Sequence, residues 1–196
     1  MITFFIGDSL TLGCGDATGL GWPGRIATAL MRGGQDLTWY NLGVRANTTI
    51  KILNRWRDEF ALRFLPGQNT RLIFSFGVAD IANDVPTQTS FDNAEAILSE
   101  AKGIGPTLFI GPTPVGDQDR TERITRLSMG FESLCDRLGV PCVPVIQSLK
   151  DSAPYASALA AYDNVHPAAG GYETLAELLL KSDTVRNFFD LENDND

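Results

Sequence analysis

Two residues suited to nucleophilic catalysis stand near opposite ends of this sequence. Ser9 follows the apolar run at residues 1–6, and His166, the only histidine, lies in Asp163-Asn164-Val165-His166-Pro167. A serine hydroxyl is a poor nucleophile until a neighbouring base takes its proton, and histidine is the usual base because it titrates near neutral pH. Asp163 could orient the imidazole from the same turn and stabilise the imidazolium that forms. These residue types predict a Ser-His-Asp hydrolytic site.

Each half of this arrangement also has a plainer interpretation. A serine after a strand is most often a turn residue. His166 could be a surface residue near a helix start and Asp163 a loop acid, because an isolated Asp-x-x-His pattern is not specific. Pro167 biases His166 toward an extended backbone and can begin a helix behind it. The catalytic interpretation therefore depends on a fold that brings Ser9 to His166.

The hydrophobic pattern alternates between short strands and amphipathic helices. This alternation implies a parallel sheet with helices on both faces, and right-handed crossovers favour a three-layer αβα sandwich of five strands in flavodoxin-like order. Ser9 then lies at the carboxyl end of the first strand, where open α/β sheets bind ligands. The predicted strands are residues 1–6, 37–42, 71–76, 107–110 and 140–146, the last at an edge because of its prolines. Two predicted helices start at Trp22-Pro23 and at Pro167, and three more have apolar faces that include Ile50, Ala94 and Ile124.

Length and composition are typical of one soluble globular domain. The chain has 196 residues, of which 43% are hydrophobic and 20% charged. We expect a single domain at residues 1–190 and a disordered acidic tail at residues 191–196. A formal net charge of -8 argues against nucleic-acid binding. We also expect a cytoplasmic protein without a signal peptide or membrane span, and the three cysteines, which make no even disulfide framework, agree with a reducing compartment.

Four blocks of the sequence, taken in order, resemble the GDSL or SGNH hydrolase family over almost the whole chain. Each block follows a predicted strand or precedes the last predicted helix. The first matches letter for letter, and the second has Ala46 where a further glycine is common. The blocks are Gly7-Asp8-Ser9-Leu10, Asn41-Leu42-Gly43-Val44-Arg45-Ala46-Asn47-Thr48-Thr49, Gly77-Val78-Ala79-Asp80 and Asp163 to Pro167.

The resemblance implies the SGNH hydrolase fold and a role for each matched residue. Ser9 is the implied nucleophile, His166 the general base and Asp163 its orienting carboxylate. The backbone N–H groups of Ser9 and Gly43 are the implied donors to the oxyanion. Asp8 and Asp80 are implied supporting residues, Asp80 as an organiser of its loop.

One position departs from the family pattern. The third block normally reads Gly-x-Asn-Asp, and its asparagine amide donates to the oxyanion, but this chain has Ala79 there. Asn83, about one turn onward if the loop is helical, is an alternative donor. Otherwise the protein works with two backbone donors, works slowly, or has a non-catalytic role.

The resemblance implies a serine hydrolase that cleaves carboxylic esters or thioesters with small acyl groups, as an esterase, lipase or thioesterase. Its expected partner is a small-molecule ester or thioester. No cofactor is expected, and no metal, because the lone histidine and scattered carboxylates form no ligand cluster. The main alternative is a binding module of SGNH fold that is catalytically weak or inactive because of Ala79.

Three further interpretations concern loops near the predicted site. Cys14 could be the nucleophile with His166 as its base. Residues 13–19 could form a dinucleotide loop, although the third glycine comes one residue late for that fingerprint. The charged segment at residues 116–126 is either a solvated helix start or a mobile rim over the site.

Overall fold

The computed structural model describes residues 1–191 and contains a five-stranded parallel sheet. The strand order is β2-β1-β3-β4-β5, so β2 lies on one side of β1, and β3, β4 and β5 follow on its other side. This is the flavodoxin-like order predicted from the sequence, and it confirms the predicted fold class. The strands are β1 (Ile2–Gly7), β2 (Thr38–Gly43), β3 (Thr70–Ser75), β4 (Thr107–Ile110) and β5 (Cys142–Val143).

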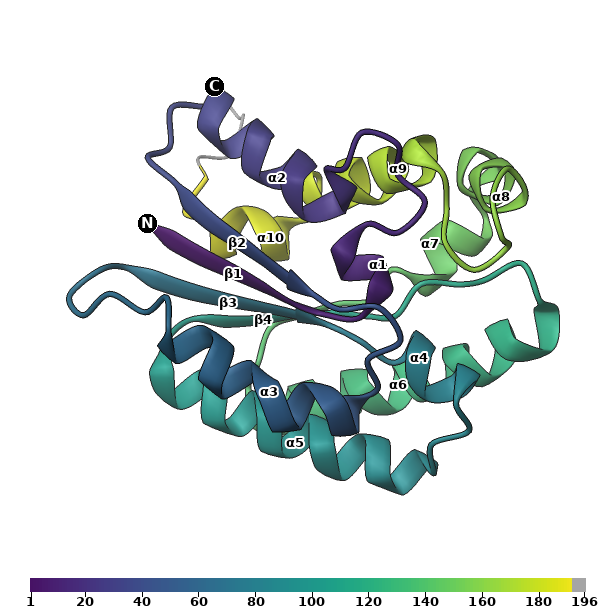
Figure 1. Cartoon of the computed structure of the whole chain (residues 1–196), viewed down its shortest axis with the longest axis horizontal. Helices are drawn as coiled ribbons and strands as arrows, with labels where there is room; N and C mark the ends of the chain where they lie inside the picture. Colours follow the sequence, from purple (N-terminus) through teal and green to yellow (C-terminus); the bar gives the residue numbers. More distant parts are fainter. Residues whose placement is uncertain (192–196) are drawn as a thin grey trace.

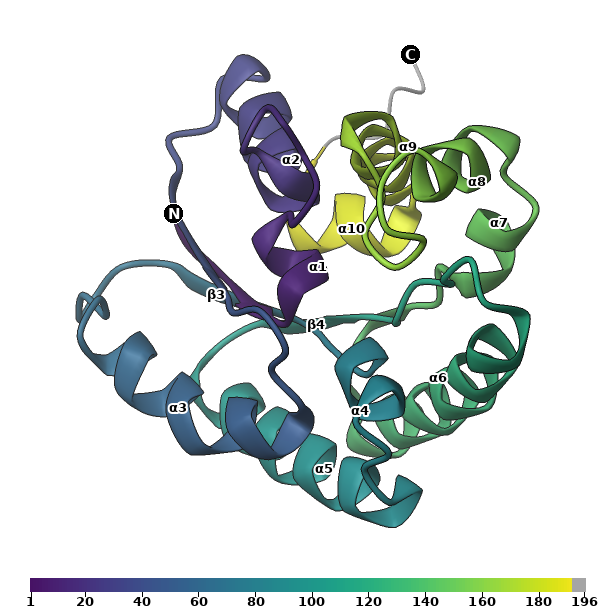
Figure 2. The ribbon, with the colours of Figure 1, turned by 45° about the vertical axis from the view of Figure 1, so that its right-hand side comes forward.

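Helices cover both faces of this sheet, as Figures 1 and 2 show. One layer contains α1 (Ser9–Leu12), α2 (Gly21–Arg32), α9 (Ala169–Leu180) and α10 (Asp183–Phe188), and α7 (Ile146–Lys150) and α8 (Ala153–Ala160) continue it toward the carboxyl ends of the strands. The other layer contains α3 (Thr49–Ala61), α4 (Val78–Ala82), α5 (Thr87–Ile104) and α6 (Gln118–Leu138). The sheet is therefore enclosed by helices, as its apolar strands require.

The core lies between the sheet and these helices. Every residue of β1 and β3 is buried. The Phe131 ring packs edge-on against Phe76 and Phe109, with centroids 5.6 and 5.4 Å away. A buried phenylalanine contributes roughly 1.5–3 kcal/mol through the apolar surface it removes from water. Helix α6 shows the helical spacing that was predicted, because it buries Ile124, Leu127, Phe131 and Leu134.

The fifth strand is much shorter than residues 140–146, so that predicted range is wrong. Only Cys142–Val143 pairs with β4. Pro141 and Pro144 flank it, and neither has a backbone N–H to continue the ladder. The chain then turns into α7 at Ile146. The strand does lie at the edge of the sheet, as predicted.

Several helix boundaries also differ from the predicted ones. The helix predicted through Ala94 already begins at Thr87 as α5, and the last predicted helix becomes α9 followed by α10. The charged segment at residues 116–126 is mostly the first half of α6, whose N-cap Asp117 accepts the Arg120 N–H at 2.8 Å. Of its two interpretations, the solvated helix start is therefore the one observed.

The predicted acidic tail begins with a residue that packs. Leu191 donates its N–H to the Arg186 carbonyl at 2.9 Å and lies partly buried against the core. The Asp190 carboxylate just before it lies 2.5 Å from an Arg71 guanidinium nitrogen. Residues 192–196, the rest of the predicted tail, lie outside the described part of the chain.

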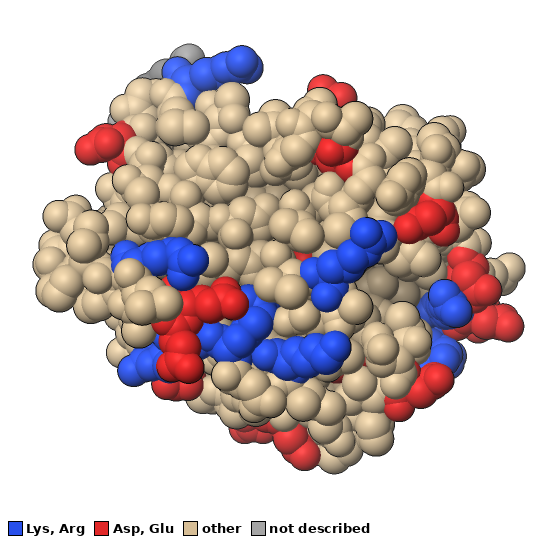
Figure 3. Space-filling view, in the orientation of Figure 1, with Lys and Arg blue, Asp and Glu red and all other residues tan. Residues whose placement is uncertain are grey.

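Basic side chains gather on one face despite the net charge of -8. In Figure 3 they lie mainly over α3 and the loop before it, next to a hollow at the carboxyl ends of the strands. Two arginines of α3 are paired with acids: Arg55 with Glu59 at 2.8 Å and Arg57 with Glu100 at 3.4 Å. Among residues 1–191 no helix is both long enough and apolar enough to cross a bilayer.

Gly7 lets β1, β3 and α1 meet closely at the edge of the sheet that carries Ser9. A Cβ atom at Gly7 would lie 2.1 Å from the Ser75 carbonyl oxygen and 2.2 Å from Thr11 Oγ1. Thr11 itself donates to the Ser75 carbonyl at 3.2 Å. The Thr11 hydroxyl and the Ser75 carbonyl thus occupy the space that a side chain at Gly7 would need, and their hydrogen bond joins α1 to β3.

We predict that Gly7→Ala lowers the free energy of unfolding by about 3 kcal/mol or more, because the methyl group forces apart backbone and Thr11 at a packed site. Urea denaturation monitored by circular dichroism measures the change. Gly170→Ala is the matched control: it lies in helix α9 with open space around its Cα, so alanine should be neutral or slightly stabilising there. Equal stability of the two variants would contradict the steric argument.

Candidate active site

Ser9 is the first residue of α1 and follows the carboxyl end of β1 after one residue. That residue, Asp8, is the N-cap, and its Oδ1 accepts the Leu10 N–H at 2.9 Å. The Ser9 side chain is buried, with 8% of the residue exposed. Because the first N–H groups of a helix have no intrahelical acceptor, the Ser9 N–H is left for another partner.

His166 is presented by the loop between α8 and α9, which the Asp163 carboxylate holds in shape. Asp163 Oδ1 accepts the N–H groups of Val165 at 2.9 Å and of His166 at 2.7 Å. Asn164 takes a φ of 60°, in the left-handed region that asparagine tolerates better than most residues. Its carbonyl oxygen accepts the Gly116 N–H at 2.6 Å, which fastens the loop to the segment after β4.

The imidazole of His166 connects the two ends of the sequence. Its Nε2 lies 2.7 Å from Ser9 Oγ, and its Nδ1 lies 2.8 Å from Asp163 Oδ2. An ionised carboxylate can only accept, so Nδ1 carries the proton toward Asp163 and the Nε2 lone pair faces the Ser9 hydroxyl. The structure brings the three predicted residues into hydrogen-bonding contact.

Asp163 stays ionised in this arrangement. Partial burial opposes its charge, but the His166 backbone N–H, the His166 ring and the Val165 N–H outweigh burial and lower the pKa of Asp163 to about 2. A carboxylate that is charged throughout the neutral range can stabilise an imidazolium on His166. The geometry therefore fixes one tautomer of the His166 ring, with Nδ1 toward Asp163 and Nε2 toward Ser9.

Asp80 organises the neighbouring loops instead of facing Ser9. Its side chain is fully buried, and burial is the main cause that raises its pKa. The carboxylate accepts the Thr49 N–H at 3.0 Å, the Thr49 hydroxyl at 2.5 Å and the Ser90 hydroxyl at 2.9 Å. It thereby joins the starts of α3 and α5 to α4.

The expected oxyanion donors are only partly available. The Gly43 N–H donates to Asn41 Oδ1 at 2.9 Å, so this predicted donor already has a partner in the structure. Asn83 is exposed and its amide donates back to the Ala79 carbonyl at 2.7 Å, so it does not lie over Ser9. Ala79 is buried in α4 and offers no side-chain donor. The Ser9 N–H remains from the predicted set.

Two residues that position the site were not singled out from the sequence. The Asn41 amide donates to the Thr11 carbonyl at 2.9 Å and so ties the end of β2 to α1. Arg55 donates to the Gly7 carbonyl at 2.9 Å and to Asn47 Oδ1 at 2.6 Å, which holds the loop after β2 against the end of β1. Both are polar residues at strand ends or on a helix facing the loop, but nothing in their spacing predicts these partners.

The family model of the GDSL-like lipase/acylhydrolase family matches residues 5–174. This span includes Ser9 and the Asp163 to His166 loop and takes in nearly the whole sheet. The chain belongs to this family. No curated protein sequence is significantly similar to it.

Solved structures of the family share the fold. A lipolytic protein of the G-D-S-L family from Veillonella parvula superposes with a TM-score of 0.78 at 14% identity, covering 94% of this chain and 98% of that one. A lipase/acylhydrolase from Enterococcus faecalis gives 0.78 at 22% identity, covering 96% and 95%. An acetylxylan esterase from Geobacillus stearothermophilus gives 0.77 at 18% identity, covering 97% and 94%.

The alternatives raised for the glycine-rich loop receive little support. Burial raises the pKa of the Cys14 thiol, the carboxylates of Asp8 and Asp163 act in the same direction, and only Arg45 opposes them. A thiol with a raised pKa is a weak nucleophile at neutral pH. The loop itself is built around Asp16, which accepts the N–H groups of Thr18 and Gly21, each at 2.9 Å. No group of three or more potential metal ligands is found among residues 1–191.

Asp8 is a buried carboxyl immediately before Ser9. It is 2% exposed, and its Oδ2 has no hydrogen-bond partner within the described residues. Burial raises its pKa to about 6, although the backbone N–H groups of Leu10 and Ala79 oppose the change. The charge of Asp80 adds to the rise. Asp8 therefore ionises within the range in which a hydrolase would be assayed.

We predict that Asp8→Asn increases the free energy of unfolding at about pH 7.5 and that its advantage over wild type vanishes near pH 4. The pKa is 3.8 when Asp8 is exposed and about 6 in the fold. Between these values the folded state binds more protons than the unfolded state, so the Asp8 contribution to stability falls as pH rises. Asparagine keeps the acceptor for the Leu10 N–H and removes the buried charge. At about pH 7.5 this should raise the free energy of unfolding by about 1–3 kcal/mol.

Urea denaturation of wild type and Asp8→Asn, from about pH 4 to about pH 7.5, measures the difference in their free energies of unfolding. Asp58→Asn, on the exposed side of α3, is the control and should leave the pH dependence as in wild type. A constant difference between Asp8→Asn and wild type at every pH would show that Asp8 does not ionise in this range.

Proposed function

We propose that this protein is a serine hydrolase that cleaves carboxylic esters or thioesters with small acyl groups. The observation that carries the proposal is the continuous contact from Asp163 Oδ2 through the His166 ring to Ser9 Oγ, at 2.8 and 2.7 Å. A serine hydroxyl within hydrogen-bond reach of an oriented imidazole is the arrangement that nucleophilic acyl transfer requires.

In the proposed reaction, His166 Nε2 takes the proton of Ser9 as Oγ attacks the acyl carbonyl carbon. The tetrahedral intermediate collapses when the imidazolium returns this proton to the leaving alcohol or thiol, which leaves Ser9 acylated. Water then attacks the acyl group with His166 again acting as base, and the acid is released. Asp163 remains ionised and holds the ring in one tautomer throughout.

The ester-hydrolase class is supported by family membership and by the fold shared with an acetylxylan esterase. Ser9 follows the carboxyl end of β1 and contacts His166 there, at the edge of the sheet where open α/β proteins bind ligands. The small-acyl assignment and the choice between ester and thioester belong to the proposal. So do the nucleophilic role of Ser9 and the oxyanion role of its N–H.

The second candidate function is a binding module of the same fold with little or no catalysis. The specific observation behind it is the shortage of oxyanion donors, because Ala79 has no amide and the Gly43 N–H is bonded to Asn41. Removing one donor typically lowers kcat by about 10²–10³. The two candidates differ in whether Ser9 reacts at all.

We expect a fluorophosphonate probe to label the protein at Ser9, and Ser9→Ala to abolish the labelling. Hydrolysis of p-nitrophenyl acetate by Ser9→Ala should fall by at least about 10³-fold, because removal of a triad member costs several orders of magnitude. Intact-mass spectrometry and initial rates are the two measurements.

Cys14→Ser is the matched control for this experiment. It should retain labelling and a rate within about threefold of wild type, since Cys14 lies near the site without contacting His166 in any described hydrogen bond. Loss of activity in Cys14→Ser with normal activity in Ser9→Ala would reassign the nucleophile. A wild-type protein that does not label supports the binding module.

We predict that Ala79→Asn raises kcat on a simple ester by at least about tenfold with a smaller effect on KM. An added amide donor stabilises charge that develops on the carbonyl oxygen only in the transition state. Steady-state kinetics on p-nitrophenyl acetate provide both constants. Ala79→Leu, whose side chain has the same number and branching of heavy atoms as asparagine but no donor, should not gain activity.

Asn83→Ala distinguishes the alternative donor. Because the Asn83 amide bonds the Ala79 carbonyl, this substitution should change kcat by less than about twofold. A large loss in Asn83→Ala together with no gain in Ala79→Asn would mean that Asn83 reaches the oxyanion after rearrangement.

A further inference from the structure

The turn that follows β2 carries Arg45 close to the candidate active site. The Val44 N–H at its start donates to the Gly7 carbonyl at 3.1 Å, which extends the pairing of β2 with the end of β1. Ala46 takes a φ of 56°, in the left-handed region, and the chain reverses direction there. The turn is therefore attached to the last residue of β1, close in sequence to Ser9.

Asn47 holds this turn in shape. Its N–H donates to the Val44 carbonyl at 3.3 Å and closes the turn, and its side-chain amide donates to the Arg45 carbonyl, also at 3.3 Å. Its Oδ1 accepts from Arg55 at 2.6 Å, and Arg55 in turn bonds the end of β1. Because the backbone is held on both sides, the base of the Arg45 side chain has a fixed position at the carboxyl edge of the sheet.

The Arg45 guanidinium has no partner in the part of the chain that the structure describes. The residue is exposed, and its side chain forms neither an ion pair nor a hydrogen bond with any of residues 1–191. Lys51 lies over the same turn, with its ammonium 3.4 Å from the Ala46 carbonyl, and no carboxylate among these residues pairs with it either. The chain has 24 acidic residues against 16 Lys and Arg, so a shortage of acids does not explain two uncompensated cations on one turn.

The positive charge of Arg45 acts on the loop that follows Ser9 and α1. Burial raises the pKa of the Cys14 thiol in that loop, and Arg45 is the group that opposes the change. The charges of Asp8 and Asp163 act on the same thiol. The Cys14 thiol is therefore within electrostatic range of both Arg45 and the orienting carboxylate of the candidate triad. In Figure 3 basic side chains over α3 and the loop before it border the hollow at the carboxyl ends of the strands.

The carboxylates around the site have other partners or are buried. Asp163 bonds the His166 ring and two N–H groups of its own loop. Asp8 and Asp80 are 2% and 0% exposed, so neither meets a guanidinium on the surface. An exposed guanidinium at the rim of a site, without a carboxylate from the protein, is available to an anionic group on a bound molecule.

We propose that the substrate is an ester or thioester with a carboxylate on its alcohol or thiol part, and that Arg45 binds this carboxylate while the acyl carbon lies at Ser9. The inference rests on the proposed hydrolase function, in which the acyl group is small and the leaving part extends to the rim of the site. A guanidinium suits this role because its planar set of N–H donors matches a carboxylate. Lys51 adds positive charge on the same side and raises the local concentration of an anionic substrate.

The test compares two acetyl esters of the same shape on the full chain. 4-Acetoxybenzoate carries a carboxylate para to the ester oxygen, and 4-acetoxybenzamide carries a neutral amide there. Initial rates at an ionic strength of about 50 mM, where exposed charges are only partly screened, give kcat/KM for each ester. The measured quantity is the charge preference, defined as kcat/KM for the anionic ester divided by kcat/KM for the neutral one.

Arg45→Gln should lower the charge preference by about fivefold, which is the upper end of what an exposed ion pair contributes. Comparing this variant with wild type also cancels the difference in intrinsic reactivity between the two esters. The change should appear mainly in KM, because the carboxylate is bound equally in the ground state and the transition state. Arg45→Lys keeps the charge and should retain most of the preference. Sodium chloride at about 500 mM should bring wild type close to Arg45→Gln.

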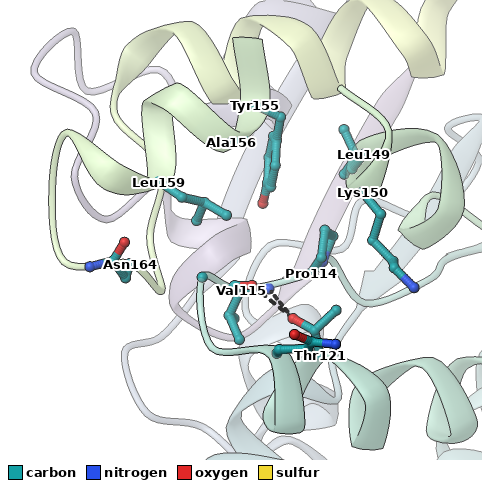
Figure 4. A pocket seen from close by; sticks show the side chains of 11 residues that line it. Pro114, Val115, Thr121, Leu149, Lys150, Tyr155, Ala156, Leu159 and Asn164 are labelled. Carbon is teal, nitrogen blue, oxygen red and sulfur yellow. Dashed lines mark hydrogen bonds between the residues drawn. The ribbon is translucent and has the colours of Figure 1, made fainter. Parts of the chain in front are cut away.

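Lys150→Gln is the matched control, because it removes an exposed cation elsewhere on the surface. Lys150 forms no ion pair within residues 1–191 and lies on the wall of a cavity of about 380 Å³ between α8 and the segment before α6. In Figure 4 its ammonium extends from the end of α7, on the opposite side of the cavity from Asn164. Neither Ser9 nor His166 lines this cavity, so Lys150→Gln should keep the wild-type charge preference.

Three results would overturn the proposal. The first is the same charge preference in wild type and Arg45→Gln, and the second is an equal fall in Lys150→Gln, which would indicate a general effect of surface charge. The third is a wild type that hydrolyses p-nitrophenyl acetate but neither of the two esters.

Failure of the hydrolase function gives a different result, because wild type then hydrolyses none of the three esters. Isothermal titration calorimetry with intact 4-acetoxybenzoate decides the anion site in that case. Binding should be about fivefold weaker in Arg45→Gln than in wild type. No binding, or equal binding by the two proteins, would contradict the role of Arg45.

Discussion

The close contact at Gly7 is the constraint on which the site depends. The absence of a side chain there allows the Thr11 hydroxyl to reach the Ser75 carbonyl, so α1 folds back directly over the ends of β1 and β3. The backbone around Ser9 is thereby held by two strands and one helix, with Asp8 as its N-cap. A serine on such a turn has little freedom to move, so in the proposed reaction the base has to be brought to it.

The Asp163 carboxylate performs this second task with both oxygens. Oδ1 shapes the backbone of the loop through two N–H groups, and Oδ2 bonds the ring of the histidine that the loop carries. One side chain thus fixes the position of His166 and its tautomer together. The resulting low pKa of Asp163 means that neither function is lost in the neutral range. The remaining attachment, from Gly116 to Asn164, makes the segment after β4 part of the same support.

Much of this arrangement could be predicted because its main residues lie at the boundaries of strongly patterned elements. Ser9 follows an apolar strand, Asp163 and His166 precede an amphipathic helix, and parallel strands with right-handed crossovers have few topologies. The short elements α4, α7 and α10 could not be predicted, because one or two turns carry too little periodicity. The hydrogen bond from the Gly43 N–H to Asn41 could not be predicted either, since it depends on how the Asn41 amide is oriented in space. The partners of Asp80, including Thr49, come from elements distant in sequence.

The start of α1 faces two negative charges in the proposed reaction. Its N–H groups and dipole stabilise the Asp8 carboxylate through Leu10, and the same helix end offers the Ser9 N–H to an oxyanion. Above its pKa of about 6, Asp8 therefore places a permanent negative charge next to the place where transient charge develops. In a buried site such a charge is poorly screened and raises the energy of the oxyanion. Because Ala79 has no side-chain donor, fewer hydrogen bonds are available to offset the repulsion between Asp8 and the oxyanion.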